Sequence, residues 1–400
     1  MSQIQKYGFF GLLAALLLVA ILLFGKTSYN RQVVVEAQHV DTVPPIPIPQ
    51  GIRIKKHAEA KTEKVKQKLD SLLKRVHKRY DFHGAVLVAQ KGKIVYSGHI
   101  GYADFRKKKL LDESSVFQLA SVSKQFTAAA VLVLMEKGRL QLTDSVTKYY
   151  PEFPYKDVTI QHLLYHTAGL PNYFWVAEHK WEGKDAPSNQ EMMDLLCSSD
   201  VGRFFIAGRR FDYSNTAYFV LASIVEKVSG LSFSEFTEKE VFKPLGMKNT
   251  YVYSYKKDTI REQQLIGYRL YRGWRHIKIP GTVNDAVVGD KNVYATTEDL
   301  YKWVEGLNSG KLLSEETVQM MYSKGKNKYG YEIPYGLGFR LSRWGEEKIY
   351  HYGKWNGFST GIVQYPADDL VLIVLEHTSF NGMTSLNANL KKLVLKHFDA

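Results

Sequence analysis

The sequence has a single cysteine, Cys197, and this scarcity excludes an intramolecular disulfide. The fold must therefore be held by packing, and the thiol count does not identify the cellular compartment. No internal repeat is visible, and no Gly-x-Gly-x-x-Gly follows an expected strand. There is also no zinc-finger or RNP pattern among the basic residues. These absences speak against a βαβ series and against a nucleic-acid-binding protein.

Acidic residues are outnumbered by basic ones, and the formal net charge is +14. The basic residues are scattered or grouped in short linkers such as residues 107–109. Attraction to anionic lipid headgroups or to an anionic wall polymer accounts for this charge economically. A soluble protein with a basic surface is the simpler alternative.

Long apolar runs are few, and the longest uncharged one spans residues 8–25. As a helix it would measure about 27 Å, enough to cross a bilayer core. Neither an Ala-x-Ala site nor a lipid-anchor cysteine follows it. We therefore predict a single-pass signal-anchor in the cell membrane after a short tail of residues 1–7, with a cleaved secretory signal as the alternative. A Pro-rich linker over residues 26–60 would then hold an extracytoplasmic, periplasmic domain off the bilayer.

Residues 61–400 read as one α+β domain. Residues 84–101 alternate around Lys91-Gly92-Lys93 and predict a hairpin. Further strands are expected near the C-terminus, so one antiparallel sheet would be built from both chain ends and flanked by helices. The region of about 125–250 is mostly helical and is inserted between these strands. The remaining helices and strands are expected at residues 61–78, 297–307, 348–353, 359–365, 370–377 and 386–398.

The stretch that organises the rest is Ser121-Val122-Ser123-Lys124, followed by apolar residues up to Met135. A helix of this length and character is a buried core helix rather than a membrane span. Ser121 at its start would have Lys124 one turn on, and a desolvated lysine can activate a serine hydroxyl. The Ser-x-x-Lys spacing occurs four more times, but only this copy opens an apolar helix. A capping serine with a snorkelling lysine is the alternative.

Two further fragments carry polar side chains toward a cleft. Tyr213-Ser214-Asn215 is the only Tyr-x-Asn and precedes an apolar helix; a nearby cationic lysine would favour the Tyr213 anion. An ordinary turn is the alternative. His351-Tyr352-Gly353 ends an expected strand, and Lys354 follows it. Gly353 would let a substrate backbone approach the strand closely.

In this order the three fragments resemble the penicillin-recognising serine hydrolases, in particular the group of class C β-lactamases, D-aminopeptidases and esterases. Residues 159–171 and 292–300 are similar to two longer stretches of that family. The likeness covers about residues 65–395. It implies a β-lactamase-like fold and an acyl-enzyme mechanism without metal or cofactor.

The resemblance also implies a role for each matched residue. Ser121 would be the acylated nucleophile, and Lys124 and Tyr213 would share the proton transfers, with the choice of base left open. Asn215 would hold the substrate amide. The implied oxyanion hole consists of the backbone N–H groups of Ser121 and Lys354. His351 would set the electrostatics of the cleft opposite Lys124, and Gly353 would border the substrate.

One departure from the family pattern bears on the substrate. Where the best β-lactamases carry Lys-Thr-Gly, this chain has His351-Tyr352-Gly353, and a histidine is mostly neutral at pH 7. We therefore expect weak or no β-lactamase activity, and a peptidase, amidase or esterase acting on a small or peptide acyl substrate, possibly wall-peptide-like. The alternatives are a non-hydrolytic penicillin-binding-like sensor and a wall-binding protein. The sequence carries no signal for an oligomeric state.

Two other features are interpreted as structural. His162 and His166 have the i, i+4 spacing of metal ligands, but His162 lacks the adjacent glutamate of the zinc-protease pattern. Cys197 lies beside Leu195 and Leu196 and is expected to be buried rather than reactive.

Overall fold

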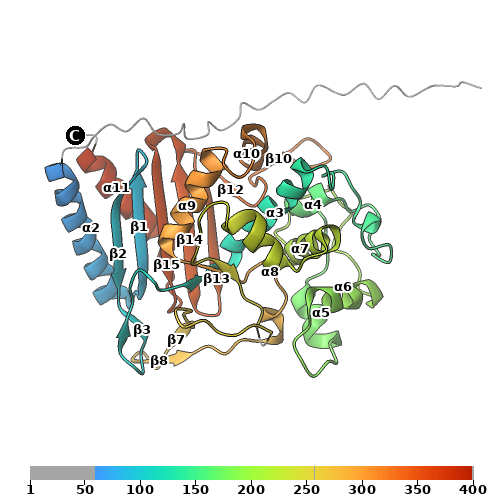
Figure 1. Ribbon diagram of the computed structural model, residues 1–400, viewed down its shortest axis with the longest axis horizontal. Helices are drawn as coiled ribbons and strands as arrows, with labels where there is room; N and C mark the ends of the chain where they lie inside the picture. The colour runs from blue at the N-terminus through green and yellow to red at the C-terminus, as the bar shows by residue number, and fades with distance from the viewer. Residues whose placement is uncertain (1–58, 256, 399–400) are drawn as a thin grey trace, which may run out of the picture. The chain divides into compact units, whose positions relative to one another are not determined.

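Both ends of the domain meet in one six-stranded antiparallel sheet, as the sequence predicts (Figure 1). The computed structural model describes residues 59–255 and 257–398. Every neighbouring pair in the sheet is antiparallel. In spatial order the strands are β12 (Arg340–Leu341), β13 (Ile349–Trp355), β14 (Phe358–Tyr365), β15 (Leu370–Glu376), β1 (Gly84–Gln90) and β2 (Lys93–Ile100).

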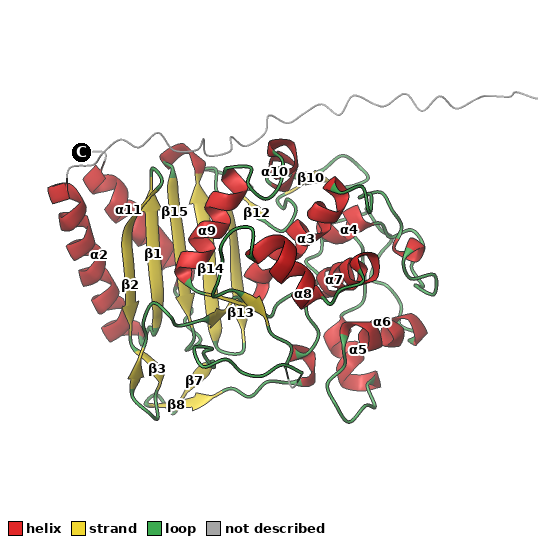
Figure 2. Cartoon of the chain, viewed as in Figure 1, coloured by secondary structure: helices red, strands yellow, loops and turns green. Residues whose placement is uncertain are grey.

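Both faces of the sheet are apolar. Successive side chains of its central strands point to opposite sides, and hydrophobic side chains occur on each side. On β1, Leu87 belongs to the larger hydrophobic core, whereas Val86 and Val88 belong to the smaller one. The smaller core lies under α2 (Glu59–Tyr80) and α11 (Met383–Phe398), which cover one face. On the other face α9 (Thr297–Asn308) packs against β1 and β15, and Figure 2 shows helices on both sides of the strands.

The region between the two halves of the sheet is mostly helical, again as predicted. Its central helix, α3 (Lys124–Glu136), is buried from Lys124 to Leu134, so the prediction of a core helix is confirmed. It packs against α7 (Asn215–Ser229). The other helices here are α4 (Ile160–Leu164), α5 (Tyr173–Lys180), α6 (Asn189–Ser198) and α8 (Phe233–Thr237), which a π-helical turn over Glu238–Phe242 extends.

Short strands and turns tie the helical region to the sheet. A three-stranded sheet has the order β5 (Phe117–Gln118), β9 (Val293–Ala295), β6 (Tyr251–Val252), and β5 leads directly into the Ser121 turn. α10 (Glu315–Met321) lies beside α9. Three two-stranded ribbons complete the described chain: β3 (Tyr102–Asp104) with β4 (Lys109–Leu110), β7 (Tyr268–Tyr271) with β8 (Arg275–Lys278), and β10 (Gly325–Lys326) with β11 (Glu332–Ile333).

The predicted tail, the apolar run of residues 8–25 and nearly all of the linker lie outside the described residues, so these assignments stay predictions. Within the described part of the chain, no single helix has the length and apolarity needed to cross a membrane. One bent pair, Asn215–Ser229 with Phe233–Phe242, meets those criteria by length and composition only.

Candidate active site

Ser121 lies on a tight turn between strand β5 and helix α3. The turn is a 3-10 helix over Ala120–Ser123, and α3 begins at Lys124 rather than at Ser121 as the sequence suggested. Residues three apart eclipse one another in a 3-10 helix, so Lys124 still lies over Ser121. Ala120 has a left-handed φ of 49°, which is costly for a residue with a side chain and is typical of functional sites.

The ammonium group of Lys124 is fully buried and faces three oxygen atoms. Its Nζ lies 3.2 Å from Ser121 Oγ, 2.8 Å from Asn215 Oδ1 and 2.8 Å from the backbone oxygen of Asp290. The rings of Tyr213 and Tyr218 lie 5.0 and 5.7 Å from it. A lysine held this way is fixed in position beside the Ser121 hydroxyl.

Burial lowers the pKa of Lys124 to about 7, because the charged form loses its hydration. The carboxylate of Asp290 opposes this shift and the guanidinium of Arg340 adds to it. Near pH 7 the amine is therefore partly neutral. The neutral amine has a lone pair that can accept the Ser121 proton, as a base next to a nucleophile must.

Tyr213 stands on the loop before α7, where the sequence placed it, and His166 holds this loop. His166 is buried, and its Nδ1 accepts a hydrogen bond of 3.0 Å from the backbone N–H of Ser214. Its backbone oxygen accepts another of 2.8 Å from Asp212, and its ring lies 4.4 Å from the ring of Tyr213. The second histidine of the pair, His162, caps α4 through Thr159. Both therefore have structural hydrogen bonds.

The prediction that Lys124 favours the Tyr213 anion is wrong. Burial raises the pKa of Tyr213 above its usual value, although the Ser121 hydroxyl and Arg340 lower it by hydrogen bonding and charge. The loss of hydration has a larger effect on this pKa than Ser121 and Arg340 have, because a phenolate, like an ammonium, is strongly stabilised by water. Tyr213 is thus a neutral phenol in hydrogen-bond reach of Ser121.

The third fragment lies inside β13 and not at its end, since the strand continues to Trp355. β12 pairs only with Tyr350 and Ile349, so the outer edge of β13 from His351 onward is free of β12. The Ser121 turn packs against this part of the strand. A Cβ added to Gly353 would lie 2.3 Å from the Leu119 oxygen and 2.9 Å from the Ser121 nitrogen, so only glycine fits there.

His351 is buried and neutral. Its Nδ1 lies 2.8 Å from the backbone oxygen of Tyr352 and must donate, so Nε2 accepts the hydrogen bond of 3.1 Å from the Tyr335 hydroxyl. Burial lowers the pKa of His351 well below its usual value, and Arg340 and Lys124 lower it further. His351 therefore brings no positive charge to the cleft.

The structure brings the three fragments together: the ring of His351 lies 6.1 Å from that of Tyr213, which in turn reaches Ser121. Asn215 begins α7 and contacts Lys124. Lys354 follows Gly353, and its exposed side chain donates to Asn381 Oδ1. The Lys354 side chain is therefore engaged elsewhere, and only the backbone N–H of Lys354 could take part in the reaction.

Sequence reasoning missed two charged residues of the site. Arg340 is half-buried, and its guanidinium lies 4.7 Å from the ring of Tyr213. It occurs on a two-residue strand, and no motif points to it. Asp290 is buried, and its Oδ1 accepts from Tyr173 at 3.1 Å and pairs with Lys291 at 3.3 Å. The proximity of Asp290 to residues 292–300 was the available signal.

A cavity of about 190 Å³ borders the loop that carries Tyr213 and Asn215. Its walls also include Leu170, Phe204 and Phe205, so it can take an apolar group next to the reacting atoms.

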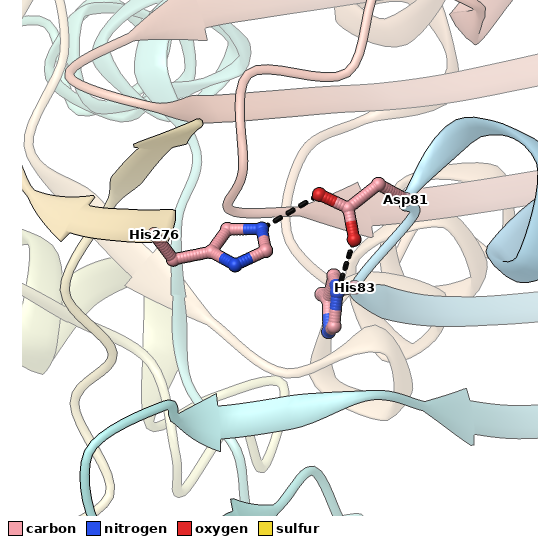
Figure 3. Close-up of side chains that lie close together, drawn as sticks. All are labelled: Asp81, His83 and His276. Atoms are coloured by element: carbon pink, nitrogen blue, oxygen red, sulfur yellow. Dashed lines mark hydrogen bonds and ion pairs between the residues drawn. The ribbon is translucent and has the colours of Figure 1, made fainter. Parts of the chain in front are cut away.

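One group of side chains in the described part of the chain has the residue types of a metal site: Asp81, His83 and His276 (Figure 3). Each histidine Nε2 lies on a different Asp81 oxygen, at 3.0 and 2.6 Å. Nδ1 of His83 accepts from the Tyr102 backbone N–H at 3.0 Å. Nε2 of His83 must then carry its proton, which leaves no lone pair for a metal there. The group fits a hydrogen-bonded clasp better than a metal site.

A serine beside a buried lysine, next to the open edge of an antiparallel strand, is the arrangement of a serine hydrolase. The comparisons with known proteins agree with this class. The family model described as Beta-lactamase matches residues 69–395. The chain therefore belongs to the Beta-lactamase family, whose relatives here are penicillin-binding-protein-like serine hydrolases.

Among curated proteins, Penicillin-binding protein 4* of Bacillus subtilis (strain 168) is 33% identical over 77% of this chain and 71% of its own length. Among solved structures, a penicillin binding protein from Bacillus halodurans is 25% identical, with a TM-score of 0.70 over 80% of this chain and 98% of that one. An octameric penicillin-binding protein homologue from Pyrococcus abyssi is also 25% identical, with a TM-score of 0.70 over 82% and 77%.

Proposed function

We propose that this protein is a membrane-anchored, extracytoplasmic serine hydrolase that cleaves an amide or ester through an acyl-enzyme on Ser121. The observation that carries the proposal is the buried Lys124, whose Nζ lies 3.2 Å from Ser121 Oγ and whose pKa is about 7. A lysine of ordinary pKa would be protonated at neutral pH and unable to act as a base.

In the proposed reaction, neutral Lys124 takes the hydroxyl proton while Ser121 Oγ forms a bond to the substrate carbonyl carbon. The oxyanion is held by the backbone N–H groups of Ser121 and Lys354, each such donor being worth about 3 kcal/mol in acyl transfer. As the tetrahedral adduct breaks down, the proton passes through the Tyr213 hydroxyl to the leaving nitrogen or oxygen. Water then attacks the acyl-enzyme by the reverse path and frees Ser121.

The charge of the cleft favours a substrate with a carboxylate. His351 is neutral, so it does not supply the positive charge that a lysine has at this position in β-lactamases. Arg340 supplies a cation instead, 4.7 Å from the ring of Tyr213. Among the described residues no ion pair joins Arg340 to an acidic side chain, so its guanidinium is available for a carboxylate. A wall-peptide-like acyl compound with a free carboxylate therefore fits this site.

Intact-protein mass spectrometry tests the proposal with the full-length chain. The chain is incubated with D-amino-acid amides, matched esters with a free or a methylated carboxylate, and β-lactams. We expect a transient acyl adduct on Ser121 that turns over fastest with free-carboxylate esters, and no adduct on Ser121→Ala. Ser145→Ala, in a second Ser-x-x-Lys with an exposed lysine, is the matched control.

Two results would contradict the proposal. An adduct that persists on Ser121→Ala would remove Ser121 as the nucleophile. A stoichiometric adduct that never turns over with any compound would instead favour the penicillin-binding-like sensor.

A further inference from the structure

A basic and aromatic hairpin, formed by β7 and β8, projects from the end of the domain where α2 finishes (Figure 1). Tyr268 pairs with Lys278 and Tyr271 with Arg275. The connecting turn has two residues with left-handed φ angles, Arg272 at 53° and Gly273 at 77°. Residues 268–278 contain three arginines and a lysine but no aspartate or glutamate.

One face of the hairpin is bound to the domain. His276 stacks on Phe105 with ring centres 3.7 Å apart, and its Nε2 donates to Asp81 at 2.6 Å (Figure 3). Asp81 directly follows α2, and its other oxygen accepts from the buried His83. Lys278 pairs with Asp104 at 3.5 Å. These contacts fix the orientation of the hairpin.

The opposite face and the turn are exposed. Arg269, Tyr271 and Arg275 alternate with the bound residues and therefore share the outer face. At the turn, Trp274 is 73% exposed and Arg272 lies beside the Tyr271 ring, 5.2 Å from its centre. In the part of the chain that the structure describes, none of the three arginines forms an ion pair. The hairpin thus presents unpaired positive charge around a large exposed indole.

We propose that this hairpin docks the domain onto an anionic lipid bilayer, with the arginines on lipid phosphates and Trp274 at the headgroup boundary. Arginine binds phosphate oxygens in pairs, and tryptophan and tyrosine prefer the membrane–water boundary. Tyr271, which is 42% exposed, adds aromatic surface on the outer face. A soluble polyanion would satisfy the arginines but would leave the Trp274 indole in water, so a bilayer is the better partner.

The proposed anchor permits this contact, and the docking proposal rests on the anchored state proposed above. Residues 26–58 separate the apolar run from α2. Fully extended they reach at most ~110 Å, whereas α2 measures about 33 Å. The linker is therefore long enough for the bilayer to meet the hairpin, although the hairpin contacts the C-terminal end of α2 and the linker joins its N-terminal end.

Site-specific fluorescence tests the docking in the full-length chain reconstituted into vesicles. Cys197→Ala removes the only cysteine, and Trp274→Cys then carries an environment-sensitive NBD label. In vesicles of phosphatidylcholine with phosphatidylglycerol we expect a blue-shifted emission and quenching by nitroxide lipid. Both signals should be lost in pure phosphatidylcholine and in the combined Arg269→Gln, Arg272→Gln and Arg275→Gln variant.

Trp344→Cys is the matched control, because Trp344 is 83% exposed and also lies beside an arginine, Arg343. Trp344 precedes β13, whereas the turn that follows β13, at Gly357, contacts Tyr268 of the hairpin. The two tryptophans therefore lie near opposite ends of that strand. Equal responses at positions 274 and 344 would overturn the proposal, as would no response at 274. Shielding of position 274 from iodide by soluble polyphosphate, without a response to vesicles, would show that the partner is a polyanion. Failure of the full-length chain to remain with either kind of vesicle would contradict the anchor, and ester turnover reports separately on the hydrolase.

Discussion

At the scale of single residues, the site depends on competition between burial and charge. Lys124 and Tyr213 lie close together, and burial moves their pKa values in opposite directions, down for the ammonium and up for the phenol. Near pH 7 Tyr213 is therefore neutral and Lys124 is partly neutral. In the proposed mechanism Lys124 is therefore the base, and Tyr213 carries protons without having to ionise.

The acylation rate should rise with pH through about 7 and be lost below it, because only neutral Lys124 can accept the Ser121 proton. Asp290→Asn removes a negative charge that favours the ammonium, so the pKa falls and the acid limb of the profile moves to lower pH. Arg340→Gln removes a positive charge, so the acid limb moves to higher pH. Single-turnover acylation of a neutral ester, measured across pH, checks both shifts.

A purely structural role for either residue would lower the rate at all pH values without moving the limb. Opposite directions are therefore the informative result, and shifts of the same sign in the two variants would contradict the assignment. A limb that follows Tyr213 instead would lie far to the alkaline side, since burial raises the pKa of that phenol.

At the scale of elements, the position of Ser121 is set by strand β13. The turn that carries Ser121 lies against Gly353, and Thr360 on β14 donates to the Leu119 oxygen at 2.6 Å. From the other side, the Val293 N–H on β9 donates to Ser123 Oγ at 3.0 Å. The Ser121 turn is thus held between elements from distant parts of the chain.

Gly353→Ala should reduce kcat/KM by about 10²-fold, because the new methyl group collides with backbone atoms and displaces the Ser121 turn by a fraction of an ångström or more. Gly202→Ala is the control, since a Cβ there meets no atom within 4 Å. Steady-state kinetics and thermal unfolding of both variants separate lost geometry from lost folding. An unchanged kcat/KM in a folded Gly353→Ala protein would show that the strand does not set the site.

Most elements were predictable because their patterns are local. The hairpin of β1 and β2 and the core helix α3 follow from alternation and from an unbroken apolar run. The extent of β13 was underestimated because Lys354 has an exposed, charged side chain, although its backbone still pairs with Ser359 on β14. Arg340 was not predictable, since its place beside Tyr213 depends on the pairing of a two-residue strand with Tyr350. The protonated state of Tyr213 was not predictable either, because it follows from the burial of the phenol, and a sequence motif does not show burial.

At the scale of the whole molecule, the proposed membrane anchoring rests on the apolar run of residues 8–25, and the net charge of +14 is compatible with an anionic membrane surface. Deletion of residues 1–58 should release the protein to the soluble fraction and leave ester hydrolysis by the domain unchanged, because every site residue lies beyond Glu59. Fractionation and ester turnover of the two forms check this. A mature N-terminus beyond Gly25 in the native protein would show a cleaved signal instead.

The pairing of β1 with β15 joins Gly84 to Glu376, close to the two ends of the domain. During synthesis β1 emerges early and has to wait for a partner that is made almost last. β13 is made only shortly before β15, and until it emerges the Ser121 turn has no strand to lie against. We therefore expect an unfinished chain to be inactive, because the Ser121 turn lies against β13 and that strand belongs to the last part of the chain to be made.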